Sequence, residues 1–327
     1  MTSVPISLLD LATVESNGRI GDALAHSVDL AQAAEAGGYQ RVWYAEHHNM
    51  PSIASSATAV LIAHVAAHTQ TIRLGAGGIM LPNHSPLVIA EQFGTLAELH
   101  PGRIDLGLGR APGSDMATFR ALRRELSASD AFPSDIIELQ QLLGDSLPRA
   151  AVNAYPGRGT RVPLYVLGSS MFGASLAAQL GLPYAFASHF APQLLTQAVA
   201  YYRAHYRPSE DHPTPYVLAA VNVVAASNDD TAEALFARAE LDRVRRFLSR
   251  GREHELTADE AVALYDTPAG EQIRDMLRYT AIGGPVRVRE ELAAFAKHAD
   301  ADELITVHPA PTPEERLESV RLAAPNS

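Results

Sequence analysis

The sequence of 327 residues contains no cysteine. Without thiols the chain can form no disulfide, no thiolate nucleophile and no thiolate metal site, and this composition is consistent with a reducing compartment. Basic residues are also outnumbered: 26 Lys and Arg stand against 37 Asp and Glu, for a formal net charge of −11. The chain lacks the dense positive surface that nucleic acid or an anionic membrane requires, so we expect neither as a partner.

Long hydrophobic runs are absent as well. No stretch approaches the roughly 18 uninterrupted apolar residues of a membrane-spanning helix. The first residues, MTSVPISLLDLATVES, have no basic region and reach Asp10 before any long apolar run, so they do not resemble a signal peptide. We therefore expect a cytoplasmic protein. What is present, 47% hydrophobic and 19% charged residues, is the composition of a globular protein with a large core.

Apolar runs of strand length alternate with segments of helical periodicity along the chain. Because a helix follows almost every run, the strands must be parallel. Eight such units favour a closed (β/α)₈ TIM barrel over an open doubly wound sheet. The expected strands are 5–12, 41–46, 72–81, 103–109, 163–168, 183–188, 216–226 and 302–307.

We expect a single domain over residues 1–327. Spans at about 111–162 and 250–283 are too long for plain connections, and we expect them to be insertions on the C-terminal rim of the barrel. Within the second span, DMLRYTA at 275–281 has a helical pattern, and the polar stretch RGREHELTADE is a candidate lid.

In a TIM barrel the functional side chains come from the C-terminal ends of the strands. The second strand ends in Glu46, His47 and His48, and the sixth ends in Ser188 and His189. A histidine at such a position suits an acid, a base or a hydrogen-bond donor to substrate, while a purely structural pair stays open. No metal site is expected, because EHH lacks the spacing of HExxH and no carboxylate cluster accompanies it.

Small and hydroxylated residues occupy two further strand ends. Gly77 and Gly78 would let a flat ligand approach the backbone, or would only relieve crowding at a barrel corner. After the fifth strand, Ser169, Ser170 and a helix start could form an anion cradle that Arg110 from the fourth strand completes. The pattern predicts a phosphate site; the alternative is that either serine is simply an N-cap. The spacing matches neither GxGxxG nor a P-loop.

Several of these segments together resemble one protein family. They are EHH after the second strand, LGAGGIMLPNHSPLVIAEQFGTLAELHPGRIDLGLGRAPG through the third and fourth units, VLGSSMFGASLAAQLGLPYAFASHF through the fifth and sixth, and the closing IGGPVRVREELAAFAKHADADELITV. On these motifs the chain resembles the bacterial luciferase-like flavin monooxygenases.

The resemblance implies a (β/α)₈ barrel that binds FMN at its C-terminal mouth, usually as a homodimer. Reduced FMN would come from a separate NAD(P)H:flavin reductase and react with O₂ at C4a. The resulting peroxyflavin would oxygenate a small organic substrate. His47 matches the catalytic histidine of the family.

The same resemblance implies a set of cofactor-binding residues. The arginine after the fourth strand matches the phosphate-binding arginine of the family, and residues 169–171 occupy the segment that wraps the phosphate. The double glycine falls where the family has a non-prolyl cis peptide under the isoalloxazine ring. The residues carried over are Ala76, Gly77, Gly78, Arg110, Ser169, Ser170 and Met171.

Other functions of similar proteins stay open. An oxidoreductase that uses the deazaflavin F420 would have the same barrel and transfer hydride without O₂, and a non-catalytic flavin-binding protein would bind without turnover. A phosphate-binding aldolase or isomerase would need a lysine or paired carboxylates at strand ends, and the sequence shows neither.

Overall fold

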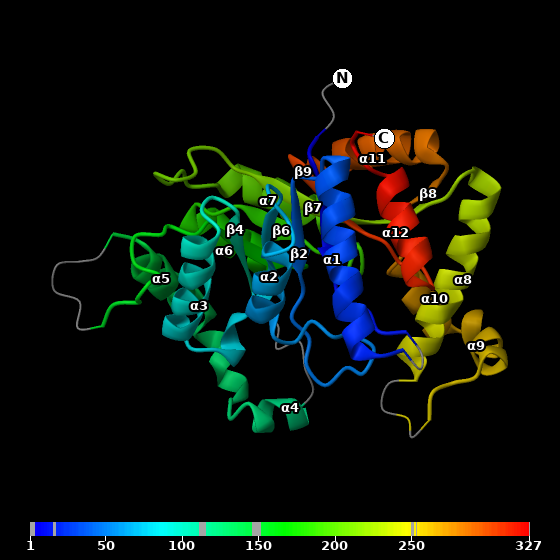
Figure 1. The fold of residues 1–327 in the computed structure, drawn as a ribbon, viewed down its shortest axis with the longest axis horizontal. Coiled ribbons are helices and arrows are strands. Elements are labelled where there is room, and N and C mark those ends of the chain that lie inside the picture. Colours follow the sequence, from blue (N-terminus) through cyan, green and yellow to red (C-terminus); the bar gives the residue numbers. More distant parts are fainter. Residues whose placement is uncertain are drawn as a thin grey trace.

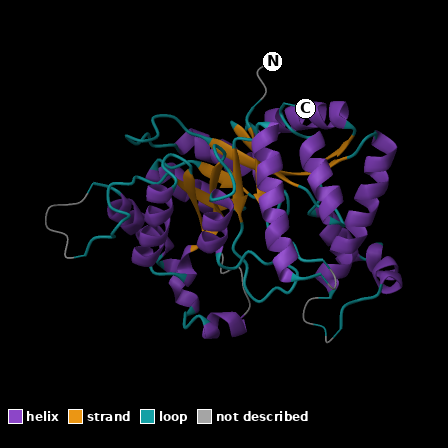
Figure 2. Ribbon diagram, in the orientation of Figure 1, coloured by secondary structure: helices purple, strands orange, loops and turns teal. Residues whose placement is uncertain are grey.

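The computed structural model describes residues 4–15, 18–110, 116–145, 152–249, 252 and 254–326. Within this part of the chain, eight parallel strands close into a barrel that helices surround (Figures 1 and 2). The described residues form these eight barrel strands and one additional strand, β8: β1 (Ile6–Asp10), β2 (Arg41–Tyr44), β3 (Arg73–Met80), β4 (Ile104–Gly109), β5 (Leu164–Gly168), β6 (Tyr184–Phe186), β7 (Val217–Ala225), β8 (Thr280–Gly283) and β9 (Glu303–Val307).

The barrel is closed by strands from opposite ends of the sequence. Around the barrel the order is β1, β2, β3, β4, β5, β6, β7, β9, and β9 returns to pair with β1. Every pairing between these strands is parallel, as the alternating pattern predicts. The predicted TIM barrel is therefore confirmed.

Helices cover the outside of the barrel. In Figure 1, α1 and α12 lie side by side, while α4 and α9 lie at the lower end of the view. The helices are α1 (Ile20–Gly37), α2 (Thr58–Ala66), α3 (Pro86–Leu99), α4 (Met116–Ala121), α5 (Phe132–Leu143), α6 (Met171–Leu180), α7 (Leu195–His205), α8 (Asp229–Leu248), α9 (Ala258–Tyr265), α10 (Pro268–Asp275), α11 (Pro285–Ala299) and α12 (Pro313–Leu322), with short 3₁₀ turns at Leu81–Asn83 and Leu126–Asp130.

A ninth strand departs from the expected secondary structure. The segment 275–281 was expected to be helical, but it leaves the end of α10 and enters β8, which pairs with residues 222–225 of β7 outside the barrel. The expectation was wrong because β7, at nine residues, extends past its barrel neighbours and offers an edge that a short strand can pair with.

Two spans expected as insertions contain regular elements. The described part of 111–162 holds α4 and α5, and α5 packs against α3 on the outside of the barrel. The span 250–283 holds α9, α10 and β8. None of the helices in the described residues combines the length and hydrophobicity needed to cross a lipid bilayer.

The core has two layers, one inside the barrel and one between barrel and helices. The N-terminal end of the interior is filled by a buried polar cluster around Arg41, the first residue of β2. Its guanidinium donates to Glu303 at 2.8 Å, to Asp105 at 2.7 Å and to the Tyr165 hydroxyl at 2.8 Å. These contacts tie β2 to β9, β4 and β5, so this end of the barrel is closed by ion pairs.

Candidate functional site

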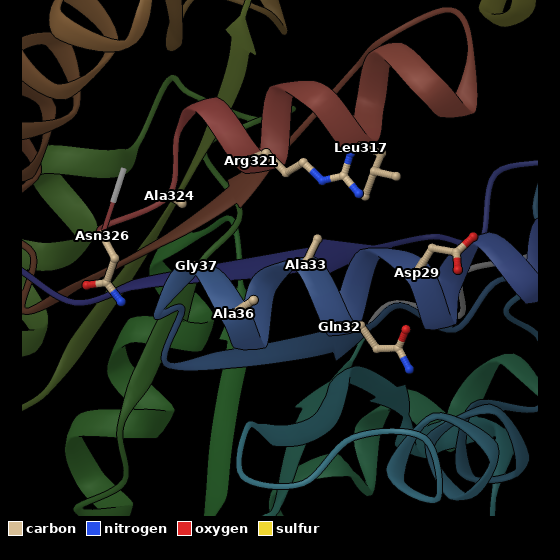
Figure 3. Close-up of a pocket in the computed structure, with 9 residues that line it drawn as sticks. All are labelled: Asp29, Gln32, Ala33, Ala36, Gly37, Leu317, Arg321, Ala324 and Asn326. Atoms are coloured by element: carbon tan, nitrogen blue, oxygen red, sulfur yellow. The ribbon is translucent and has the colours of Figure 1, made fainter.

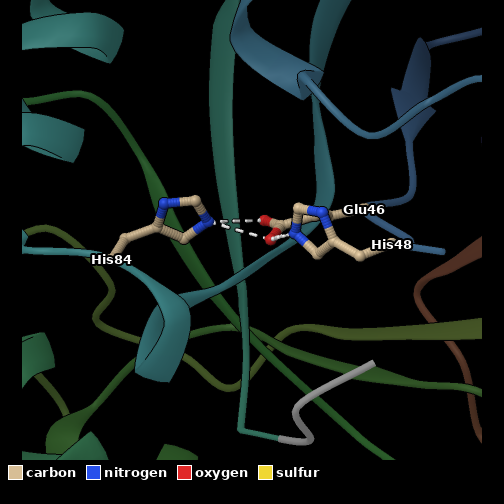
Figure 4. Close-up of side chains that lie close together, drawn as sticks. All are labelled: Glu46, His48 and His84. Carbon is tan, nitrogen blue, oxygen red and sulfur yellow. Dashed lines mark hydrogen bonds and ion pairs between the residues drawn. The ribbon is translucent and has the colours of Figure 1, made fainter. Parts of the chain in front are cut away.

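Side chains from the ends of β2 and β3 converge on Glu46, which is fully buried. Its carboxylate accepts hydrogen bonds from Nε2 of His48 at 2.8 Å and Nε2 of His84 at 2.9 Å (Figure 4). The backbone N–H of Met80 donates to the same carboxylate at 2.9 Å, and the N–H of Glu46 donates to the Gly78 carbonyl at 3.3 Å. Glu46 therefore fixes the end of β2 to the end of β3.

The charge of Glu46 is maintained by these donors. Burial raises the pKa of Glu46, but the hydrogen bonds from His48 and His84 outweigh burial and lower the pKa to about 2. The hydrogen bond to Glu46 in turn raises the pKa of His48 against the opposing effect of burial. Glu46 is thus a carboxylate at neutral pH, and His48 binds its proton more tightly than free imidazole does.

The same three residues could hold a metal ion, since their ligand atoms all lie within 4.8 Å of one another. The N···O separations are those of hydrogen bonds, in which Nε2 carries a proton, whereas a metal needs the lone pair of that nitrogen. The sequence reasoning missed the cluster because His84 is 38 positions from Glu46. The sequence signal that could have revealed the cluster was the position of His84, just beyond the third strand. That the site binds no metal stays a prediction.

The double glycine lies at the end of β3, and its Gly77–Gly78 peptide is cis, as the resemblance implied. A Cβ atom on Gly77 would lie 2.8 Å from Cβ of Trp43, and one on Gly78 would lie 2.7 Å from the Gly107 carbonyl oxygen. Crowding alone therefore requires glycine at both positions, as the simpler interpretation held. Ala76, in β3, is fully buried in the layer between the barrel and the helices, so its side chain is not exposed to a ligand. Contact of this segment with a flat ligand stays a prediction.

Arg110 and the start of α6 lie together on adjacent strand ends. The Arg110 guanidinium carbon is 4.1 Å from the ring centroid of Phe172, in the first turn of α6. Ser170 occupies the N-cap position but its side chain makes no capping hydrogen bond. The N-cap position of Ser170 agrees with the simpler alternative, although the missing capping hydrogen bond leaves its hydroxyl unused for that purpose. Ser169 is half-buried and Ser170 is exposed.

His47 follows β2 and is half-buried, with its backbone N–H donating to the Ser55 carbonyl at 3.2 Å. The strands that carry the predicted site residues, β2, β3, β4 and β5, are consecutive neighbours in the barrel. His189, which follows β6, lies close enough to His47 for their charges to interact. Sequence reasoning noted His189 at a strand end but assigned it no role.

A separate concavity of about 580 Å³ lies between α1 and α12 on the outer face of the barrel (Figure 3). Its lining is mainly small or amide side chains, with Asp29 and Arg321 as the charged groups. Because it opens between two outer helices, away from the strand ends, it shares no residue with the cluster at the barrel mouth.

Comparison with known proteins identifies the family to which this chain belongs. A family model described as luciferase-like monooxygenase matches residues 5–302. A protein of Escherichia coli (strain K12) named luciferase-like monooxygenase is 46% identical over 324 residues, which cover 98% of this chain and 96% of that protein. The chain belongs to the luciferase-like monooxygenase family.

Other relatives agree with the assignment. An N-acetyl-S-alkylcysteine monooxygenase of Bacillus subtilis (strain 168) is 38% identical over 227 residues, 66% of this chain and 68% of that protein. The crystal structure of apo-MsnO8 superimposes with a TM-score of 0.87 at 37% identity, covering 98% of this chain and 97% of the other. More distant structures share the fold alone, among them 3,6-diketocamphane monooxygenase in complex with FMN and an F420-dependent secondary alcohol dehydrogenase, with TM-scores of 0.72 and 0.71 at 14% and 15% identity.

Proposed function

We propose that this luciferase-like protein is an FMN-dependent monooxygenase. It takes reduced FMN from a separate NAD(P)H:flavin reductase and uses O₂ to oxygenate a small organic substrate. The proposal includes a cytoplasmic location and a homodimer. Bound reduced flavin would supply the electrons that activate O₂, and the residues of the chain bind the flavin, orient it and exclude water.

The observation that carries the proposal is the position of Arg110 beside the start of α6. A guanidinium matches phosphate oxygens with its planar fork, and a helix start favours an anion through its free N–H groups. Arg110 has no carboxylate partner among the described residues, and the Ser170 hydroxyl is not used for capping. Both groups are therefore available, and together they fit the phosphate of FMN.

The proposed position of the phosphate suggests roles for the remaining residues. If the phosphate is held after β4 and β5, the ends of β2 and β3 would hold the flavin ring, and His47 would serve there as acid, base or hydrogen-bond donor. Glu46 keeps these two strand ends together through its own hydrogen bonds. The proposed cofactor-binding residues are Ala76, Gly77, Gly78, Arg110, Ser169, Ser170 and Met171.

The names of close relatives favour oxygenation over hydride transfer. The Escherichia coli and Bacillus subtilis relatives are both named monooxygenases, at 46% and 38% identity. The F420-dependent neighbour shares only 15% of its residues and supports the fold without its chemistry. FMN and O₂ are therefore preferred to F420 in the proposal.

The test of the phosphate anchor is the Arg110→Ala variant. We expect its affinity for FMN to fall by about 10- to 100-fold, because a charge-assisted hydrogen bond is lost. Its affinity for riboflavin, which lacks the phosphate, should change less than about twofold. Titration of flavin fluorescence measures both, with Arg321→Ala on the exposed face of α12 as the control. Equal FMN affinity in Arg110→Ala and wild type would overturn the assignment.

A second measurement tests the use of oxygen. Reduced FMN is bound under anaerobic conditions, O₂ is admitted, and the return of oxidised-flavin absorbance is followed with and without protein. We expect the protein to change this rate, and His47→Ala to remove the change while retaining FMN binding. Tighter binding of F420 than of FMN, with no reaction toward O₂, would favour the hydride-transfer alternative.

A further inference from the structure

His189 is held at the barrel mouth by contacts on both sides of its backbone. The Ser188 hydroxyl donates to the Ala220 carbonyl at 2.5 Å, and Nδ2 of Asn222 donates to the carbonyl of His189 at 2.8 Å. Ala220 and Asn222 are both in β7, so the short turn after β6 is tied to the neighbouring strand. The Phe190 ring packs edge-on against the imidazole, with centroids 4.9 Å apart and planes at 84°. The backbone of His189 is therefore held in place, and Phe190 packs against one side of its ring.

The strand order places His189 and His47 on opposite sides of the barrel mouth. Going around the barrel, three strands separate β2 from β6 in either direction, so His47 and His189 follow strands on opposite sides. Side chains from opposite strand ends approach each other only when both point toward the barrel axis. His189 nevertheless lies close enough to His47, and to Arg243 of α8, for their charges to interact. His189 and His47 therefore lie near each other at the C-terminal end of the barrel.

The protonation state of His189 follows from its surroundings. Burial, then the charges of Arg243 and His47, lower the pKa of His189 to about 3, so the ring is neutral at physiological pH. Its Nδ1 atom is sealed from solvent and has no hydrogen-bond partner in the described residues. A proton on Nδ1 would be a buried donor without an acceptor, which is costly, so the neutral ring carries its proton on Nε2.

We propose that His189 is a second binding residue of this site, donating a hydrogen bond from Nε2 to an acceptor atom of the flavin ring held between it and His47. This inference rests on the proposed function, since it requires flavin at the mouth. The two imidazoles then have different tasks: His47 is available for proton transfer, while His189 stays neutral and positions the ring. Asn222 and Ser188 are positioning residues that hold His189 in place.

Two amide variants test which nitrogen matters. The side-chain amide of His189→Gln reaches the position of Nε2, whereas that of His189→Asn reaches only the position of Nδ1. We expect His189→Gln to bind oxidised and reduced FMN within about threefold of wild type and His189→Asn to bind about tenfold more weakly. His68→Gln, an exposed histidine far from the strand ends, is the matched control.

NMR of wild-type protein with ¹⁵N-labelled histidine supplies a second measurement, which does not depend on flavin binding by any variant. The His189 signal, assigned by its loss in His189→Gln, should show the Nε2–H neutral form at pH 7 and shift on addition of FMN, while the His68 signal stays fixed. Wild-type affinity in His189→Asn, or an Nδ1–H ring unaffected by FMN, overturns the inference but leaves the proposed function standing. No binding of FMN by the wild-type protein would instead remove the proposed function itself.

Discussion

At the scale of single residues, Glu46 is the buried charge on which the barrel mouth depends. It lies between two imidazoles and also binds the backbone of β3, so one carboxylate orders side chains that are distant in sequence. A buried carboxylate is tolerated only when donors replace the water that it loses. Because all of these donors act on the ionised form, the stability that they provide must depend on pH.

The sign of this dependence follows from the lowered pKa. Glu46 has a pKa of about 2 in the folded protein and an ordinary value of 4.5 when exposed, so its stabilisation is complete above 4.5 and is lost as pH falls toward 2. We expect Glu46→Gln to reduce the free energy of unfolding by about 3 kcal/mol at pH 7, and the difference from wild type to shrink as pH approaches 2. Urea unfolding at several pH values measures it.

The pKa of His48 provides an independent check on the same variant. NMR titration should give a value above 6.5 in the wild type and a lower one in Glu46→Gln, since the raising contact is removed. Glu98→Gln, on the exposed face of α3, should change neither quantity. A constant stability difference from pH 7 to pH 2 would contradict the ionised state assigned to Glu46.

At the scale of elements, helix starts are stabilised unevenly. The N-cap residue of helix α8 is Asn228, whose side chain accepts a hydrogen bond from the N–H of Thr231 at 2.9 Å, and two aspartates occupy the first turn. The N-cap residue of helix α1 is Arg19, which has the extended backbone angles of an N-cap but makes no capping hydrogen bond. A cation at that end also opposes the helix dipole. The two helices therefore form a matched pair for substitution.

We expect Asn228→Ala to destabilise the fold by about 1 kcal/mol, because an N–H of α8 loses its acceptor. Arg19→Asp should stabilise it by about 0.5 to 1 kcal/mol, since it supplies a missing cap and a favourable charge. Midpoints of urea unfolding, with unchanged slopes, measure both effects. Opposite signs for the two variants are required; a loss of stability in Arg19→Asp would refute the account of α1.

At the scale of the whole molecule, the two ends of the barrel are built differently. The N-terminal end is filled by Arg41 bound to Asp105 and Glu303, while the C-terminal end carries the histidines and small residues of the candidate site. Burial alone lowers the pKa of Arg41, but the two carboxylates outweigh it and raise the pKa above its ordinary value. The cation is therefore permanent, and we expect the cluster to stabilise the barrel without taking part in binding.

Arg41→Met should destabilise the protein by about 3 to 5 kcal/mol, because Asp105 and Glu303 would be left buried without this cation. Arg321→Met on the outer face should change stability by less than about 0.5 kcal/mol. Urea unfolding compares the two, and the folded fraction of Arg41→Met should still bind FMN within about twofold of wild type. Selective loss of FMN binding at unchanged stability would place Arg41 in the functional site instead.

The regular alternation of apolar runs and helical patterns was enough to predict the barrel, because parallel strands require crossover helices. Local signals were less reliable where tertiary pairing decides the outcome. Strand β8 is only four residues long and exists because β7 extends past its neighbours. Helix α12 was missed although Thr312 and Glu315 form a capping box that marks its start.

The sequence by itself determined the fold class and pointed to the strand ends of the candidate site, since hydrophobic periodicity and residue type are local properties. It also led from Arg110 to the start of α6, because consecutive units become neighbouring strands. Only the tertiary structure decided that His84 binds Glu46 and that His189 lies near His47. The first depends on the turn after β3, which brings His84 back to the end of β2, and the second depends on the closure of the barrel, which brings the ends of distant strands together.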